Sequence, residues 1–395
     1  MNFYTKTLIL VSLYFLFTGC SPKEELKWFK GNLHTHTYWS DGDAFPEMVL
    51  DWYKSNGYQF VALSEHNIIA NVEKWKKIPR SVIYRQGFDD YLKKYGDDWV
   101  DYKEDSSGLS VRLKTEAEYL PLFQEEGAFS ILKAEEITDS FEGKPLHMNA
   151  TNVQELIEPR HGGSVAETLQ NNINAVLEQR EKTGLPIMPH INHPNFGWGI
   201  SVEDMKELTG ERFFEVFNGH PGVRNYGDSA HISTEAMWDQ INIAYLERGQ
   251  PLMFGLGTDD SHHYHKFGGQ FSNSGRGWVM VQAKSLDPAD LIYAMEAGQF
   301  YASSGVTLNK LEQNSGKIEL EIATLPGVQY TIEFIGVKKG SNQSEVFETV
   351  EGNGATFNLT NEILFVRAKI TSTKRKENPF QVGDLESAWT QPINK

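Results

Sequence analysis

Between residues 28 and 304 the chain alternates apolar, strand-like runs with helical patterns, and this alternation constrains the fold more than any other feature. It is typical of α/β proteins with a largely parallel sheet. The predicted strands are 28–33, 60–64, 129–135, 186–191, 213–218, 251–257 and 278–282. The predicted helices are 46–56, 165–182, 234–248 and 287–297. Each helix ends close to a glycine, a common helix terminator, and we therefore expect a large α/β domain over residues 28–304.

Two other segments depart from this rhythm. Residues 71–126 are rich in aromatic and charged side chains, and an insertion of that length between strands is usually functional, often a lid. From about residue 305 short alternating strands follow one another without long helices, at 317–323, 329–337, 355–359 and 363–371. This pattern predicts a small antiparallel β domain over residues 305–395.

The first 20 residues have the layout of a signal peptide. Lys6 precedes an apolar run that is too short for an ordinary membrane span, and small residues lead to Cys20. The ending Phe17–Cys20 resembles a bacterial lipobox, which implies that Cys20 is lipidated and becomes the first mature residue. We expect residues 21–27 to be a tether and the protein to be exported and lipid-anchored to the cell envelope, on its periplasmic or surface side.

Charge and cysteine content limit the class of partner. The formal net charge is −16, which disfavours long-range capture of nucleic acid or of an anionic membrane. A local anion site remains compatible with this charge, because bound metal ions can invert the potential inside a cleft. Cys20 is the single cysteine of the chain, so no intrachain disulfide can form.

Histidines and carboxylates gather at the ends of the predicted strands. All 12 histidines lie between residues 34 and 265, and histidine is the commonest transition-metal ligand. His34 and His36 follow the first strand at a spacing that places both on one face. The other strand-end or neighbouring groups are Asp41, Glu65, His66, Glu135, Glu136, His147, His193, Asp260 and His262. In a barrel the carboxyl ends of the strands meet at one mouth, so this coincidence predicts a shared metal site.

Read together, these segments resemble the ordered motifs of the PHP (polymerase and histidinol phosphatase) family. The motifs are Leu33-His34-Thr35-His36, Ser40-Asp41-Gly42, Leu63-Ser64-Glu65-His66-Asn67, Glu136-Ile137-Thr138, His147, Asn192-His193-Pro194 and Asp260-Ser261-His262. The resemblance covers roughly residues 28–304. It implies a distorted seven-stranded (β/α) barrel with two or three metal ions at the strand mouths and a phosphoesterase activity.

The resemblance also implies a division of the ligands. His34, His36, Glu136 and Asp260 would hold one ion, and Glu136 would bridge to a second ion held by His147 and His193. Asp41, His66 and His262 would hold a third. Mixed histidine and carboxylate ligation suits Zn, Mn or Fe. Paired divalent ions would lower the pKa of a bridging water, and the resulting hydroxide would attack phosphorus in line.

Three further residues are candidates for catalysis. His190 precedes His193 by three positions, and it could contact substrate, donate a proton or simply pack. Arg276, between two glycines, is a candidate phosphate clamp because a guanidinium matches phosphate oxygens as a fork. Glu65 stands where the family usually has Asp. Glu215 and Asn218 are expected only to line the pocket or cap a loop, and Asp259 to orient a ligand.

Several functions are compatible with these residues. The first expectation is hydrolysis of a small phosphorylated metabolite or of a phosphorylated lipid or glycan head group. A 5′–3′ exonuclease would need a basic and aromatic channel, for which the insertion offers Arg80, Arg85, Arg112 and Lys114, but the net charge disfavours it. A metal-dependent amidohydrolase and a non-catalytic glycan- or metal-binding surface lipoprotein also fit the pattern.

Overall fold

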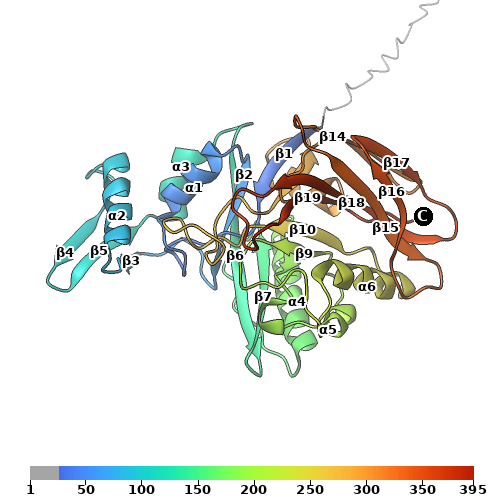
Figure 1. Ribbon diagram of the computed structural model, residues 1–395. Coiled ribbons are helices and arrows are strands. Elements are labelled where there is room, and N and C mark those ends of the chain that lie inside the picture. The colour runs from blue at the N-terminus through green and yellow to red at the C-terminus, as the bar shows by residue number, and fades with distance from the viewer. Residues whose placement is uncertain (1–25) are drawn as a thin grey trace, which may run out of the picture.

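The computed structural model describes residues 26–395 (Figure 1). The predicted signal peptide, Cys20 and most of the predicted tether lie outside the described residues. Within residues 26–395, no helix is long and apolar enough to cross a membrane.

A thirteen-stranded mixed sheet forms the centre of the molecule, in the order β10-β9-β8-β7-β6-β2-β1-β11-β12-β19-β18-β15-β16. Its first ten strands in that order are β10 (Phe254–Thr258), β9 (Phe213–Asn218), β8 (Met188–Ile191), β7 (Lys144–Thr151), β6 (Ser130–Phe141), β2 (Phe60–His66), β1 (Lys27–Asn32), β11 (Trp278–Ala283), β12 (Phe300–Ser303) and β19 (Leu385–Thr390). The pairs β1–β2, β2–β6, β8–β9 and β9–β10 are parallel, and the others are antiparallel. The seven strands predicted over residues 28–282 are all formed.

The two ends of the run from β1 to β10 approach each other at the carboxyl side of the strands. Thr35, just after β1, forms an isolated parallel bridge with Ser261, just after β10. The amide of Asp260 donates to the carbonyl of His34, and the amide of His36 donates to that of Ser261, each over 3.0 Å. Among the described strands no continuous ladder joins β10 to β1. The predicted distorted seven-stranded barrel is therefore not closed by a continuous hydrogen-bonded ladder among the described strands. The strands form a curled mixed sheet whose two ends meet at the Thr35–Ser261 bridge.

Strand β7 was not among the seven strands predicted over residues 28–282. It returns antiparallel to β6 through a two-residue turn, with Phe141 opposite Lys144. Both turn residues, Glu142 and Gly143, have positive φ angles of 48° and 79°. Such turns match the right-handed twist of the flanking strands. The hairpin places His147 beside Glu136 on the same sheet.

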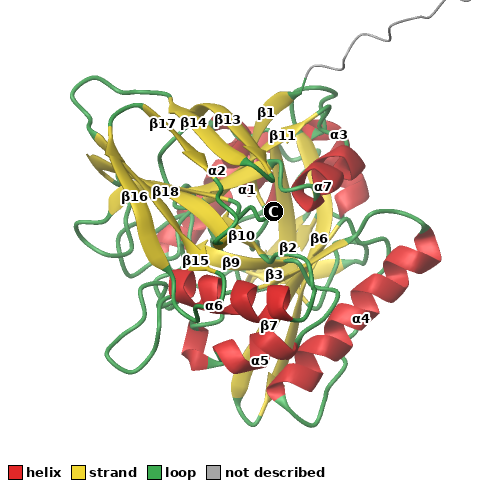
Figure 2. Cartoon of the chain, turned by 90° about the vertical axis from the view of Figure 1, so that its right-hand side faces the viewer, coloured by secondary structure: helices red, strands yellow, loops and turns green. Residues whose placement is uncertain are grey.

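Helices cover the outer side of the sheet. Figure 2 shows α4 (Val165–Thr183), α5 (Val202–Glu207) and α6 (Thr234–Glu247) together along one side. Leu169, Ile173 and Val176 of α4 are buried against the strands in one core cluster with Ile191 and Phe214. As predicted, α4 ends at a left-handed glycine, Gly184, with φ of 69°. Helix α1 (Pro46–Ser55) packs on β2, and α7 (Pro288–Glu296) packs on β11.

The segment 71–126 folds into a three-stranded sheet and two helices. The sheet and α2 protrude at the left of Figure 1, whereas α3 lies beside α1. Its elements are β3 (Lys74–Lys77), α2 (Val82–Tyr95), β4 (Tyr102–Asp105), β5 (Gly108–Leu113) and α3 (Glu116–Phe123). Buried Glu47 of α1 accepts hydrogen bonds from Tyr91 and Trp99, which fix the insertion to the rest of the molecule. Lys74 of β3 donates to the carbonyl of Trp39. The insertion therefore contacts the loop that carries Asp41.

The C-terminal strands extend the same central sheet. They are β15 (Tyr330–Lys338), β16 (Glu345–Glu351) and β18 (Ile363–Arg375), while β13 (Leu308–Asn314), β14 (Lys317–Ile322) and β17 (Gly354–Asn358) form a separate sheet. Strand β19 pairs with both β12 and β18. A buried bidentate ion pair between Arg367 of β18 and Asp239 of α6, at 2.9 and 3.0 Å, ties the strands to the helical layer. The β strands predicted here are present, and the division into two domains stays a prediction.

Candidate metal centre

The strand ends bring all nine predicted ligands into one cluster. Within this cluster, four overlapping groups of side chains have ligand atoms within 4.8 Å of one another. These groups are His36/Asp41/His66/His262, His34/His193/Glu215, His34/His36/Glu136 and His66/Glu136/His147. Asp260 lies 3.3 Å from His34 Nε2 and 3.4 Å from His36 Nε2.

The innermost part of the cluster brings two imidazoles and a carboxylate together. The Nε2 atoms of His34 and His36 are 3.1 Å apart, and both lie within 3.2 Å of Oε2 of Glu136. A neutral imidazole has one N–H and one lone pair, so two lone pairs and carboxylate oxygens directed at a common point are a donor set that a cation satisfies. All three side chains are buried. This donor set fits a transition-metal ion.

Glu136 also faces a second group through its other oxygen. Its Oε1 lies 3.0 Å from His147 Nδ1 and 3.5 Å from His193 Nε2. Asp260 likewise directs Oδ1 to His34 and Oδ2 to His193, the latter over 3.8 Å. Each of these carboxylates therefore spans two groups of histidines. Such an arrangement allows one carboxylate to bridge two neighbouring cations.

The third group lies at the open side of the cluster. Asp41 directs Oδ2 to His66 Nε2 at 3.5 Å and Oδ1 to His262 Nε2 at 3.3 Å. The side chain of Asp41 is 56% exposed, whereas His34 and His36 are fully covered. His36 faces this group with Nδ1, so it stands between the innermost and outermost groups. The cluster is therefore open to solvent on the side of Asp41.

The surrounding charges keep the carboxylates ionised. Burial alone would raise the pKa of Glu136, but His66, His34 and His147 lower it well below its ordinary value. Burial would likewise raise the pKa of Asp260, and His34 with its neighbours lowers it. In the opposite sense, burial lowers the pKa of His66, and Glu136 and Asp41 outweigh burial and raise it to about 9. Glu136 and Asp260 are thus ionised, which is the form of a carboxylate that binds a cation.

Glu215 is the functional residue that the sequence analysis undervalued. It accepts hydrogen bonds from the Thr258 hydroxyl at 2.7 Å, the His193 amide at 2.8 Å and the Asn218 side chain at 2.7 Å. Its Oε1 lies 2.7 Å from His34 Nδ1, on the side of the ring that faces away from Glu136. With so many donors already bound, Glu215 orients His34 instead of holding an ion itself. A carboxylate inside the otherwise apolar run 213–217 was the available signal.

Glu65 holds the loop that carries Asp41. Its carboxylate accepts from the Thr37 amide at 3.0 Å, from the Thr37 hydroxyl at 2.6 Å and from the hydroxyl of Ser40. Glu65 is buried and belongs to none of the four potential ligand groups. Its geometry is that of a positioning residue. The longer side chain, compared with the usual Asp, spans the distance from β2 to this loop.

His190 lies behind the cluster. It is fully buried, its Nε2 is 3.7 Å from Glu215, and among the described residues neither ring nitrogen has a hydrogen-bond partner. Burial lowers its pKa. A side chain without exposed surface is not placed to meet a substrate from solvent. The geometry therefore favours packing behind His34 over direct contact with substrate.

The guanidinium of Arg276 forms its hydrogen bonds with other groups of the protein. Its Nε donates to the carbonyl of Asn378, and its terminal nitrogens donate to the carbonyls of Gly219, Gly268 and Phe271. The remaining donor faces the side-chain oxygens of Asn273 and Asn378 at 3.5 and 3.3 Å. All five N–H groups are thus engaged, and the side chain is 2% exposed. This geometry does not support the predicted phosphate clamp, and it makes Arg276 a tie between loops.

Backbone strain concentrates at the same place. Three non-glycine residues of the site, Asn67, His193 and Asp260, have positive φ angles of 48°, 22° and 49°. Such conformations cost about 1–3 kcal/mol each and persist where the surroundings impose them. Asp260 is held by its amide bond to His34 and by Asn218, whose side chain donates to Oδ2 at 3.1 Å. The strain fixes the direction of two metal-facing side chains.

Structure comparison finds PHP-like proteins, the family that the motifs resemble. One is a two-domain protein from Bacteroides vulgatus that contains a predicted PHP-like metal-dependent phosphoesterase, with 13% identity and a TM-score of 0.40 over 93% of this chain and 98% of that one. Another is a candidate metal-dependent phosphoesterase from Bifidobacterium adolescentis, with 13% identity and a TM-score of 0.32 over 60% and 88%. An amidohydrolase from Chromobacterium violaceum, with bound sulfate and no metal, gives 12% and 0.30 over 68% and 96%.

No protein-family model matches the chain, and no curated protein matches it. Because the TM-scores lie below 0.5, the chemistry of the site is inferred from its own residues.

Proposed function

We propose that the protein is a metal-dependent hydrolase of phosphoesters. The observation that carries the proposal is the bridging arrangement of Glu136, whose two oxygens face different groups of histidines at 3.0–3.2 Å. Bound divalent ions would acidify a water molecule and neutralise the oxygens of a phosphoryl group. The ligand atoms, their burial and their charges all fit such ions.

The chain's own residues would supply position and access. Glu136 and Asp260 would hold neighbouring ions at a fixed separation, since each directs one oxygen to each of two histidine groups. Glu215 would keep His34 in the tautomer with the proton on Nδ1, which leaves Nε2 free to ligate. The buried inner face excludes water, and the exposed Asp41 side admits the substrate.

A positively charged side chain near the open face would bind the phosphate oxygens that do not contact the metal ions. Lys76 of β3 donates to the carbonyl of Ser40 over 3.1 Å, next to Asp41. Burial lowers the pKa of Lys76, and so does its neighbour Lys74 to a smaller extent. The insertion thereby brings positive side chains to the rim of the cluster. This is the role that the sequence pattern had predicted for Arg276.

A small phosphorylated substrate is preferred to nucleic acid. The basic side chains of the insertion that could have formed a channel are mostly paired within it. Arg85 binds Asp89 and Glu104, Arg112 binds Asp101 and Glu118, and Lys114 binds Asp101. Paired cations on an acidic protein provide little attraction for a polyanion.

Metal analysis combined with a substrate screen tests the proposal. Protein produced without residues 1–20 is expected to contain at least two equivalents of transition metal and to hydrolyse generic phosphomonoesters or diesters with added Mn²⁺. Chelation should abolish the activity, and Asp260→Asn should lower both metal content and rate. Protein that binds no metal, or that cleaves only amides and no phosphoester in the same screen, would refute the proposal.

A further inference from the structure

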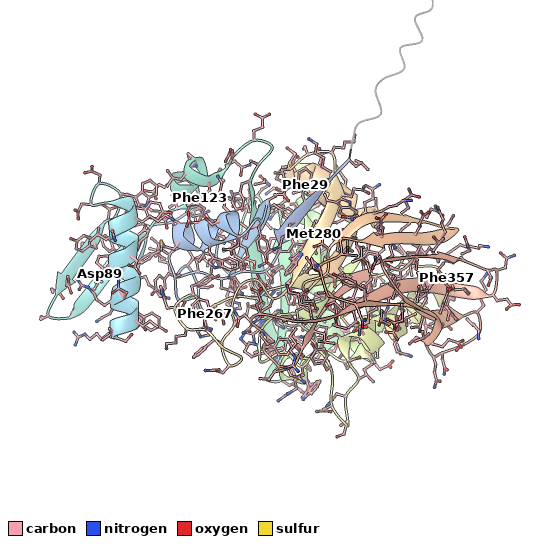
Figure 3. All side chains as sticks on the ribbon, turned by 45° about the horizontal axis from the view of Figure 1, so that its top comes forward. Phe29, Asp89, Phe123, Phe267, Met280 and Phe357 are labelled. Carbon is pink, nitrogen blue, oxygen red and sulfur yellow. The ribbon has the colours of Figure 1, made fainter. Side chains whose placement is uncertain are left out.

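A second cavity lies away from the metal cluster, between β1, α1 and β11 on one side and the segment 374–386 on the other. It measures about 770 Å³, and none of the nine metal-facing residues lines it. Its walls combine aromatic and cationic side chains, chiefly Trp52, Trp278, Phe267, Lys30 and Lys376. Figure 3 marks Phe267 on a loop between the insertion, labelled at Asp89, and the C-terminal strand with Phe357. Small-molecule sites have this size and often occur at such junctions.

The two lysines are not engaged in ion pairs. Within residues 26–395, neither Lys30 nor Lys376 makes an ion pair with a carboxylate. Lys30 Nζ lies over the rings of Tyr58 and Trp278, at 3.9 and 4.1 Å from their centroids, and Lys376 Nζ lies 4.0 Å over Phe217. Burial lowers the pKa of each lysine to about 8. Asp259 acts on Lys30, and Asp384 on Lys376, without an ion pair. Two partly buried ammonium groups without an ion-pair partner thus line one cavity, where they can bind an anion.

A third lysine of the same cavity shows the contrast. Lys374 pairs with Glu386 at 2.7 Å, so its charge is already compensated. The cavity contains four cationic side chains, counting Arg276, and two acidic ones, Glu377 and Glu386. This local excess of positive charge occurs in a chain whose formal net charge is −16. The positive charge of the cavity is therefore a local feature, opposite in sign to the charge of the whole chain.

We infer that this cavity binds a small acidic sugar, with its carboxylate or phosphate held by Lys30 and Lys376 and its ring against Trp52 and Trp278. Trp52 and Trp278 are half-buried and line the cavity, so the surface of their indoles that Lys30 does not cover can pack against the C–H groups of a sugar. The ammonium groups supply charge-assisted hydrogen bonds. The loop of Gly275 and Arg276 lies between this cavity and the candidate metal cluster in the hydrogen-bond network. Gly275 and Arg276 line the cavity, and their amides donate to Asp259 at 2.9 and 2.6 Å, one residue before Asp260.

Calorimetric titration with three probes tests the inference. Glucuronate, glucose 6-phosphate and neutral glucose are titrated into the metal-loaded protein. We expect the two anionic sugars to bind with a Kd of about 1 mM or tighter and glucose to bind at least tenfold more weakly. Binding of glucuronate alone or of glucose 6-phosphate alone would identify the carboxylate or the phosphate as the anion recognised.

Variants separate this cavity from the metal cluster. Lys30→Met and Lys376→Met should each weaken binding of the anionic sugar about tenfold or more, and Lys30→Arg should restore most of it. Lys374→Met, the matched control, should leave the Kd within about twofold, because Glu386 already neutralises that lysine. Phosphoester hydrolysis should be unchanged in all four variants.

Two outcomes would overturn the inference. One is equal affinity for glucose and for the anionic sugars, or no binding of any probe. The other is binding that survives both Lys→Met changes but is lost in His36→Ala, which would place the sugar at the metals. If Lys30→Met does not fold, Lys30→Arg and Lys376→Met still decide the question, because they retain or remove charge at independent positions.

Discussion

His34 and Glu215 form a buried pair in which Nδ1 of the imidazole lies 2.7 Å from Oε1 of the carboxylate. Burial would raise the pKa of Glu215, but His34 outweighs it and lowers that pKa, so the ionised carboxylate can only accept a hydrogen bond from Nδ1. Burial lowers the pKa of His34, but Asp260, Glu215 and Glu136 outweigh it and raise that pKa, so an ion would displace the proton on Nε2 while Nδ1 keeps its own. The pair thus determines which nitrogen of His34 is available to an ion.

Glu215→Gln should weaken metal binding about 10- to 100-fold, since an amide can present its NH₂ to His34 and lose the preference for this tautomer. Metal content after dialysis against a graded chelator series measures the change. The matched control is Glu211→Gln, because Glu211 is also buried but bonds to the amides of Arg212 and Phe213. Equal metal retention in the two variants would contradict the orienting role.

Glu65→Ala should release the loop of Thr37 and Ser40 and selectively weaken the outermost ion group. We expect the affinity for one ion to fall about 10- to 100-fold while the others stay bound. Elemental analysis at limiting metal measures the stoichiometry. Glu65→Asp, which keeps the charge on a shorter side chain, should recover part of the loss. A variant that loses every ion at once would show that Glu65 supports the whole cluster.

Arg276→Ala should destabilise the fold, because it leaves several buried carbonyl oxygens without donors. The free energy of unfolding should fall by about 3 kcal/mol or more, and Arg276→Lys should recover little because an ammonium cannot reach so many acceptors. Denaturant titration provides the measurement. The opposite result, an unchanged midpoint with kcat/KM lowered at least tenfold, would restore the phosphate-clamp interpretation.

Lys76→Met should raise KM for phosphoesters about tenfold with a smaller change in kcat, because the lysine would bind phosphate oxygens before and during the reaction alike. Steady-state kinetics separate the two constants. Lys77→Met is the control, since Lys77 is its exposed neighbour on β3. If both variants behave like the parent, the rim of the insertion does not contact the substrate.

Asp239→Ala should lower the free energy of unfolding by about 3–5 kcal/mol, since it leaves the Arg367 guanidinium buried with only the longer contact to Glu235, at 3.6 Å. Asp239→Leu combined with Arg367→Met should recover much of this loss, because it removes both charges. Chemical denaturation of the single and double variants measures the coupling. Additive effects would mean that the pair contributes nothing specific.

The sequence predicted the positions that depend on local pattern. Strand ends follow from apolar runs and helix ends from glycines such as Gly184, so His34, Glu136 and Asp260 could be placed at one mouth from the sequence. Strand β7 was not predicted because its pairing depends on the turn at Glu142 and Gly143. The alternation of strands and helices contains no information on the conformation of that turn. The sequence predicted a barrel, but it could not show that β1 and β10 meet through one bridge, between Thr35 and Ser261, instead of a continuous ladder.

Side-chain roles were predictable only where the residue type allows few of them. Two histidines at the spacing of His34 and His36 leave little choice, whereas an arginine between glycines can face a ligand or its own loops. The carbonyls that bind Arg276 come from separate segments, including Asn378, which is 102 residues away, and no local pattern identifies them. The importance of Glu215 is similarly non-local, because its partners are His34, His193 and Thr258.

The bridge between Thr35 and Ser261 has a consequence for the order of events during folding. The innermost ligands lie next to both partners of this bridge. In the sequence they extend from His34 to Asp260, which is more than half of the chain. Contacts between such distant residues form late, because a long loop must close before they are gained. A partly folded chain therefore offers an ion isolated histidines rather than a site. Tight metal binding should therefore appear only when the fold is complete, so the time course of metal binding would report the last step of refolding.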